Sequence, residues 1–196
     1  MIPILILAAG QSARMKGRDK LLEDVGGMPL LRKQVLTAQE TGHPIFVALP
    51  SAADERQRAI ADLEASIITI PDATEGMSAT MRGAVAALPQ APAFMITLGD
   101  LISLETSDFL AVINARAAHS DHLIWRGATA DGKPGHPILF DASLRASFAN
   151  LSGDRGGESI VRPLRSETYL VALPDQRARF DLDTPEDWAA WRASNR

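Results

Sequence analysis

The stretch that decides the fold is residues 5–22, LILAAGQSARMKGRDKLL. It begins as an apolar run and breaks at Gly10 into a short loop that is small, polar and basic. Such an apolar run indicates a buried strand or a buried helix. Because the run from Ile2 contains proline only near its start, we expect residues 2–7 to form the first, buried strand of a parallel sheet.

The loop after this strand is typical of a site for phosphate groups. Its first residues, Ala8, Ala9 and Gly10, have almost no side chain, so backbone N–H groups there can come close to a ligand. Within seven residues the loop then supplies four cations: Arg14, Lys16, Arg18 and Lys20. A nucleoside triphosphate carries roughly four negative charges, which two basic side chains and one divalent cation balance. Composition alone fits a solvated turn equally well, and the spacing excludes both a P-loop and the usual dinucleotide fingerprint.

Strands and helices alternate along the first two thirds of the chain. The pattern predicts strands at residues 2–7, 44–49, 66–70, 93–98 and 122–129, with helices between them that begin near Pro29, Ser51, Ser78 and Thr106. The alternation then weakens. In this last third the pattern predicts strands at 136–140, 167–173 and 178–182 and helices at 141–150 and 158–164. It also predicts a glycine-rich loop at 151–157 and a last helix from Thr184. We therefore expect a three-layer α/β fold with a mainly parallel sheet flanked by helices, in one domain over residues 1–196.

Three carboxylates would form a metal site if the two segments that contain them converge. Asp100 directly follows the apolar strand predicted at 93–98, and Asp181 and Asp183 alternate with apolar residues, so a period of two puts both on one face. Two such charges about 4 Å apart repel by roughly 4 kcal/mol at an effective dielectric near 20, which a bound cation would offset. All-oxygen ligands suit Mg²⁺. Without a metal, Asp100 caps a turn and Asp183 begins the last helix.

Net charge and composition exclude some classes of binding partner. The net charge of −4 argues against a nucleic-acid binder, which needs a basic face. The chain has no cysteine, in keeping with a reducing compartment, and its apolar N-terminal run is too short to span a membrane. We expect a cytoplasmic protein that binds neither nucleic acid nor membrane.

The motif Leu7-Ala8-Ala9-Gly10-x-Ser12-x-Arg14-Met15, followed by Lys20-Leu21-Leu22, resembles the signature of nucleotidyltransferases that join a nucleotide to a phosphorylated acceptor. Within that superfamily it is similar to the MobA-like group, and most similar to molybdenum cofactor cytidylyltransferases. The resemblance implies a Rossmann-like fold of the nucleotide-diphospho-sugar transferase type. It also implies that residues 7–10 and Ser12 contact the nucleotide, and that Arg14 and Lys20 hold the triphosphate.

Two acidic motifs of that family have counterparts here. The C-terminal Asp-x-Asp-Thr-Pro-Glu-Asp motif is complete at residues 181–187, whereas in the Gly-Asp-x-Pro motif around Asp100 the proline is replaced by Ile102. The resemblance implies that Asp100 and Asp183 hold the metal and that Asp100, Arg14 and Lys20 are catalytic. The departure at Ile102 leaves the shape of the loop after Asp100 open.

Other segments resemble family elements around the cleft. Ser78 lies in a segment like the family's Gly-Met-Ser-x-Ser-Leu element, which implies a nucleotide contact, although a helix N-cap explains this serine equally well. Two segments of this chain resemble the acceptor-binding loops of the group. The resemblance implies five acceptor-binding residues: Gly135, His136, Pro137, Gly153 and Asp154. Each segment also reads as a plain turn.

The resemblance implies a Mg²⁺-dependent enzyme that transfers CMP from CTP to molybdopterin and releases pyrophosphate. The N-terminal half would bind the nucleotide and the C-terminal half mainly the acceptor, with a downstream molybdoenzyme as a further partner. Ala9, where guanylyltransferases of the group tend to have glycine, favours cytidine. Three alternatives stay open: a guanylyltransferase on molybdopterin, a nucleotidyltransferase on a sugar or alditol phosphate, and a non-catalytic nucleotide- or pterin-binding adaptor for a molybdoenzyme.

Overall fold

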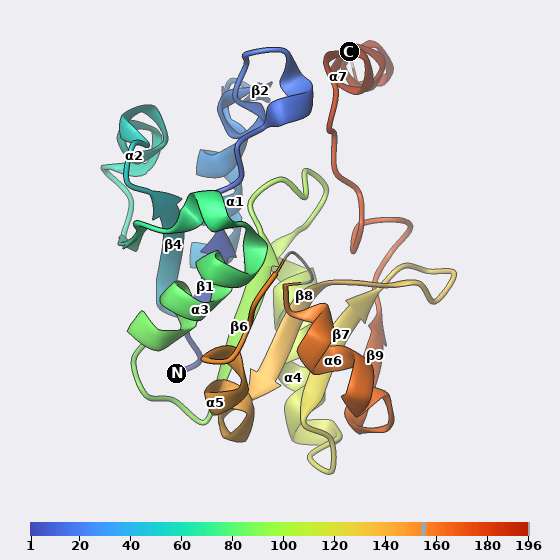
Figure 1. The fold of residues 1–196 in the computed structure, drawn as a ribbon. Helices are drawn as coiled ribbons and strands as arrows, with labels where there is room; N and C mark the ends of the chain where they lie inside the picture. The colour runs from blue at the N-terminus through green and yellow to red at the C-terminus, as the bar shows by residue number, and fades with distance from the viewer. Residues whose placement is uncertain (154–155, 196) are drawn as a thin grey trace.

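The computed structural model describes residues 1–153 and 156–195. Within them, seven strands form one sheet in the order β5-β4-β1-β6-β8-β7-β9 (Figure 1). The four strands β1, β4, β5 and β6 run parallel, at Ile4–Leu7, Ile45–Pro50, Ala65–Ile70 and Ala93–Leu98. The strand β8 (Pro134–Asp141) is antiparallel to both β6 and β7 (Ile124–Ala128), and β9 (Thr168–Ala172) is parallel to β7. The predicted α/β fold with a mainly parallel sheet is confirmed.

Helices cover both faces of this sheet. The α-helices are α1 (Leu30–Gln39), α2 (Asp54–Ile60), α3 (Met77–Ala87), α4 (Thr106–Ala118), α5 (Arg145–Phe148), α6 (Glu158–Val161) and α7 (Pro185–Ser194). Short 3-10 turns lie at η1 (Ala13–Met15), η2 (Lys20–Leu22), η3 (Ala73–Glu75), η4 (Ala142–Leu144) and η5 (Arg162–Glu167), and β2 (Asp24–Val25) pairs with β3 (Met28–Pro29) in a separate hairpin. In Figure 1, α3 and α6 lie in front of the sheet and α4 lies behind it.

The strand β1 shows why the sheet is central. Its side chains alternate between two apolar cores: Ile4 and Ile6 pack with α1 and α4 on one face, and Leu5 and Leu7 pack with α3 and α5 on the other. None of these four side chains is more than 6% exposed. A strand buried on both faces reads as a continuous apolar run, which is the pattern that opens the sequence.

Some predicted boundaries are wrong. The second helix begins at Asp54 rather than near Ser51, and α3 begins at Met77 with Gly76 as its N-cap, so Ser78 lies inside the helix. Gly76 has a φ of 109°, which favours glycine at that position. The strand predicted at 178–182 does not form, and only an isolated antiparallel bridge joins Asp181 to Leu101.

The last helix begins as predicted. Thr184 is its N-cap and forms a capping box with Asp187. Within the described residues, no helix is long and apolar enough to cross a membrane.

Candidate active site

A cavity of about 500 Å³ opens where β1 and β6 end. The loop that follows β1 lines one side of the cavity, from Ala8 to Arg14, and Lys20 lies on the same side. The other side contains Asp100, which follows β6, and two carboxylates from the C-terminal segment, Asp181 and Asp183. Because both strands are parallel neighbours, their carboxyl ends meet at the same edge, where ligands of open α/β sheets bind.

The loop presents its backbone to this cavity. In the part of the chain that the structure describes, the N–H groups of residues 9–13 have no hydrogen-bond partner. Ser12 has a φ of 51°, in the left-handed region, and its side chain is held in place. Its Oγ donates to Asp19 Oδ1 at 3.3 Å and accepts from the backbone N–H of Lys20 at 3.2 Å. The loop therefore offers a row of free donors, as an anion site requires.

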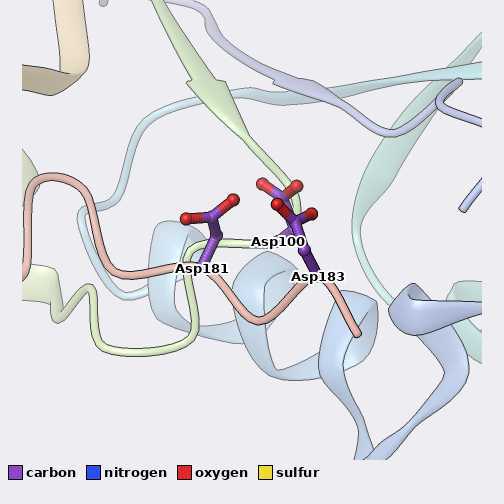
Figure 2. Close-up of side chains that lie close together, drawn as sticks. All are labelled: Asp100, Asp181 and Asp183. Atoms are coloured by element: carbon purple, nitrogen blue, oxygen red, sulfur yellow. The ribbon is translucent and has the colours of Figure 1, made fainter. Parts of the chain in front are cut away.

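Three carboxylates converge on the opposite side. One oxygen from each of Asp100, Asp181 and Asp183 lies within 4.8 Å of the other two (Figure 2). Burial, with further repulsion from Asp183 and Asp100, raises the pKa of Asp181 above its ordinary value. Asp100 Oδ1 is buried and has no hydrogen-bond partner among the described residues. An unpaired buried carboxylate oxygen in a cluster of acids fits an oxygen-liganded divalent cation.

Two predicted cations contact these carboxylates. The Lys20 ammonium is paired with Asp100 and lies 3.0 Å from Asp183 Oδ1, and Arg14 Nη1 lies 2.8 Å from Asp183 Oδ2. Burial lowers the pKa of Lys20, but the two carboxylates outweigh that effect and raise it above its ordinary value. Lys20 is thus charged, and the glycine-containing loop and the distant C-terminal acids meet in one site.

A second cavity, of about 780 Å³, adjoins the first and shares Leu98 and Asp181 with it. Its lining includes Gly135 and His136, together with three guanidinium groups, those of Arg126, Arg165 and Arg179. Because a Cβ atom on Gly135 would lie 2.1 Å from the Ala178 carbonyl oxygen, only glycine fits there. Burial and the charge of Arg126 lower the pKa of His136 to about 4, so this histidine is neutral at pH 7.

The remaining predicted residues lie elsewhere. Ser78 is 2% exposed and lines neither cavity, because its Oγ donates to the Ser152 carbonyl at 3.3 Å and accepts from the Gly156 N–H at 3.2 Å. Its nucleotide contact stays a prediction, and Thr80 of the same helix lines the first cavity.

Of the other acceptor-side candidates, Pro137 is buried and Gly153 is exposed, and neither lines the second cavity. Asp154 lies outside the described residues.

Sequence reasoning missed several residues of the site. The sequence predicts Asp181 on the same face as Asp183 but gives it no metal-binding role, and the structure places it in the acidic cluster. Arg56 binds the loop after β1, but a charged residue on a helix gives no sign in the sequence that it is buried. The three arginines of the second cavity come from β7, η5 and the segment after β9, so only the folded chain brings them together.

A parallel-sheet edge with an anion-binding loop, two cations and an acidic cluster suits the binding of a metal-bound nucleotide. The family model of the MobA-like NTP transferase domain matches residues 4–169. The chain therefore belongs to the MobA-like NTP transferase family, as the motifs predicted.

Solved structures show the same fold. Rv0371c from Mycobacterium tuberculosis H37Rv is 26% identical, with a TM-score of 0.84 over 97% of each chain. A structure of that protein in complex with manganese is 25% identical, with a TM-score of 0.80 over 98% of each chain. A nucleotidyl transferase from Methanothermobacter thermautotroptrophicus shares 19% identity and has a TM-score of 0.77, over 99% of this chain and 97% of that one. No curated protein sequence matches this chain.

Proposed function

We propose that this nucleotidyltransferase transfers CMP from CTP to molybdopterin, with Mg²⁺ as its metal ion. The observation that carries the proposal is the meeting of Lys20, Asp100 and Asp183 in the cavity at the ends of β1 and β6. A cation and two carboxylates from three distant parts of the chain are what a metal-bound triphosphate needs as its binding partners.

The first cavity is assigned to the donor nucleotide. The unpaired N–H groups of residues 9–13 bind phosphate oxygens, and Arg14 and Lys20 balance their charge. Both cations are now paired with carboxylates, so they exchange those partners for phosphate when the donor binds. The methyl group of Ala9, where guanylyltransferases of the family tend to have glycine, supports cytidine as the base.

The acidic cluster is assigned to the divalent ion. Asp100 and Asp183 hold it, and Asp181 lies close enough to serve as a third ligand. The unpaired Oδ1 of Asp100 supports this assignment, as does the manganese complex of the mycobacterial relative. The ion supplies positive charge that stabilises the transferring phosphoryl group.

The second cavity is assigned to the acceptor. It adjoins the donor cavity at Asp181, so an acceptor phosphate there lies next to the donor triphosphate. Gly135 and His136 line it, whereas Pro137 and Gly153 do not. Its arginines complement an anionic acceptor, and its apolar lining residues suit the flat ring system of a pterin.

The reaction then needs little beyond positioning. A phosphate oxygen of the acceptor attacks the α-phosphorus of CTP, the new phosphorus–oxygen bond forms, and the bond to the β-phosphate breaks to release pyrophosphate. The attacking phosphate is already ionised, so no general base is required. Lys20 and Arg14 neutralise the charge of the triphosphate, as in phosphoryl transfer generally.

The loop after Asp100 keeps a fixed shape without the family's proline, which supports an enzyme over an adaptor. Ile102 is 2% exposed and packs with Met15 and Trp188. The carbonyl of Leu101 accepts a hydrogen bond from Gln34 Nε2 at 2.9 Å, and the carbonyl of Ile102 accepts one from Lys33. In this proposal the protein works in the cytoplasm and delivers its product to a molybdoenzyme.

Pyrophosphate release tests the proposal. It is measured with each of the four nucleoside triphosphates, with and without molybdopterin, in Mg²⁺ and again in excess EDTA. We expect release only with CTP, molybdopterin and Mg²⁺ together. Pyrophosphate release with GTP or with a sugar phosphate would show that the substrates are others than CTP and molybdopterin. No release under any condition would favour the non-catalytic adaptor.

The Lys20→Ala variant tests the assigned chemistry. Removing the ammonium takes away charge at the triphosphate, and we expect turnover to fall by about 10²–10³, the usual effect of one electrostatic group. Lys16→Ala is the matched control, because Lys16 belongs to the same loop but pairs with Glu186 outside the cavity. Equal rates in the two variants would refute the role of Lys20.

A further inference from the structure

A buried arginine binds the back of the donor loop. Arg56 of α2 is 7% exposed, and it has no part in the transfer reaction. Its Nη1 donates to the Ala8 carbonyl at 2.6 Å, and its Nη2 donates to the Gly10 carbonyl at 2.8 Å. Its Nε and Nη2 also bind the two oxygens of Asp19, at 2.6 and 2.9 Å. One guanidinium therefore connects α2 to both ends of the loop.

These two carbonyl contacts fix two peptide groups. In a trans peptide the C=O of one residue and the N–H of the next point in opposite directions. Because the carbonyl groups of Ala8 and Gly10 point toward Arg56, the N–H groups of the next residues, Ala9 and Gln11, point away from Arg56. Both residues line the donor cavity, whereas Arg56 does not, and both N–H groups are unpaired among the described residues.

The contact with Asp19 fixes the other end of the loop. Asp19 Oδ1 accepts hydrogen bonds from Ser12 Oγ and from the Leu21 N–H at 3.0 Å, and Ser12 in turn accepts from the Lys20 N–H. The backbone on both sides of Lys20 is thus held by a carboxylate that Arg56 holds. A chain of hydrogen bonds runs from α2 to the residue that pairs with Asp100.

We propose that Arg56 is a positioning residue, which aims the N–H groups of Ala9 and Gln11 and the start of η2 at the triphosphate of the donor; this inference rests on the proposed function. Only arginine meets all the contacts, because its planar fork donates to two carbonyls and a carboxylate at once. Lysine keeps the charge but has one donor atom and lacks the fork.

The test measures the binding of CTP and of inorganic tripolyphosphate by calorimetry, with Mg²⁺ present. Tripolyphosphate has no base or sugar, so it reports on the loop alone. We expect Arg56→Met and Arg56→Lys each to weaken both ligands at least tenfold. Folding is followed by circular dichroism and thermal unfolding.

The matched control is Arg32→Met. Arg32 also binds an aspartate with two nitrogens, Asp62 at 2.5 and 2.7 Å, and donates to a carbonyl of α2, that of Ala59. It lies outside the donor cavity, so its loss should leave both affinities within twofold of wild type.

Removing Arg56 alone leaves Asp19 unpaired, so the single variant can unfold. The double variant Asp19→Asn, Arg56→Met removes both charges and keeps the test available in that case. Any of these Arg56 variants that folds and binds tripolyphosphate as tightly as wild type overturns the inference. If wild-type protein binds neither ligand, the proposed function fails first, which is a distinct result.

Discussion

His136 lines the second cavity without a charge, although three arginines and Asp181 also line that cavity. Burial disfavours the imidazolium, and Arg126 repels it. Its Nδ1 lies 3.5 Å from the Ile96 carbonyl, at the limit of a hydrogen bond. At neutral pH this side chain can therefore shape the cavity and exchange a hydrogen bond, but it cannot bind an anion there as a cation.

This shift predicts how stability depends on pH. The pKa of His136 is about 4 when folded and about 6.5 when unfolded, so between these values the unfolded chain binds the extra proton. The contribution of His136 to the free energy of unfolding is therefore fully present above pH 6.5. It falls by up to about 3 kcal/mol as the pH drops toward 4.

Denaturant unfolding at pH 7 and pH 4.5 measures this loss. The His136→Gln variant has no such proton to bind, so we expect it to lose less stability than wild type over the same range. Identical losses in the two proteins would show that His136 is not the group responsible.

Among the elements, α1 stabilises the acidic site from a distance. Gln34 is fully buried in this helix, and its amide holds the Leu101 carbonyl. Leu101 follows Asp100 and bridges to Asp181, so one glutamine supports the loop between two of the three carboxylates. The family's proline would stiffen this loop by itself, whereas here a helix does so from outside.

The Gln34→Leu variant should therefore weaken metal binding. It removes the hydrogen bond that the Leu101 carbonyl accepts from Gln34, and the loss of such a buried bond costs about 1–3 kcal/mol of folding stability. We expect Mn²⁺ affinity, measured by electron paramagnetic resonance, to fall several-fold. Gln39→Leu makes the same change on the same helix, where no side-chain hydrogen bond is described for Gln39, and should leave Mn²⁺ affinity unchanged. Equal affinities in both variants would contradict this role of α1.

The elements also show what the sequence could predict. Where apolar runs and turn residues agree, as at β1, β6 and the capped start of α7, the predicted positions are correct. The prediction fails where tertiary contacts decide: the alternating segment at 178–182 forms no strand. Its described backbone contacts with distant parts of the chain are a single bridge from Asp181 to Leu101 and a hydrogen bond from the His136 N–H to the Ala178 carbonyl. The prediction of Ser78 as a helix cap is wrong, because Gly76 is the N-cap and Ser78 links α3 to residues 152 and 156.

The site was predictable to a similar degree. Local motifs identified Lys20, Asp100 and Asp183, because each lies in a short pattern with its own chemistry, and the structure brings the three together. Their roles in binding and catalysis stay predictions. Residues such as Arg56 and Gln34 act through backbone carbonyls far away in the sequence, and no local pattern encodes such a contact.

At the scale of the whole molecule, the acidic cluster links the middle of the chain to its C-terminal segment. Asp100 follows β6, and Asp181 and Asp183 precede α7, which is itself attached to the N-terminal part by Arg192 and Glu23 at 2.6 Å. In Figure 1, α7 and the β2 hairpin lie at the same end of the molecule. These carboxylates come together only when the chain is folded, so a cation held between them would bind the folded state and not the unfolded one.

Metal binding should therefore stabilise the whole fold. At a free Mn²⁺ concentration about 100 times its dissociation constant, linkage contributes about 2.7 kcal/mol. For a chain of this size we expect the unfolding temperature to rise by roughly 5–10 °C. Calorimetry with Mn²⁺ and with EDTA measures the rise, and Asp183→Asn should lose most of it. A full rise in that variant would place the ion elsewhere.

The position of Asp181 and Asp183 after all seven strands also matters during synthesis. A ribosome makes the sheet strands and the donor loop first, so the nascent chain can fold most of its cores while the last acids are still in the exit tunnel. Until they emerge, Lys20 can pair with Asp100 but not with Asp183, and Arg14 lacks its contact with Asp183. A chain that stops before Asp181 therefore lacks two of the three carboxylates of the acidic cluster.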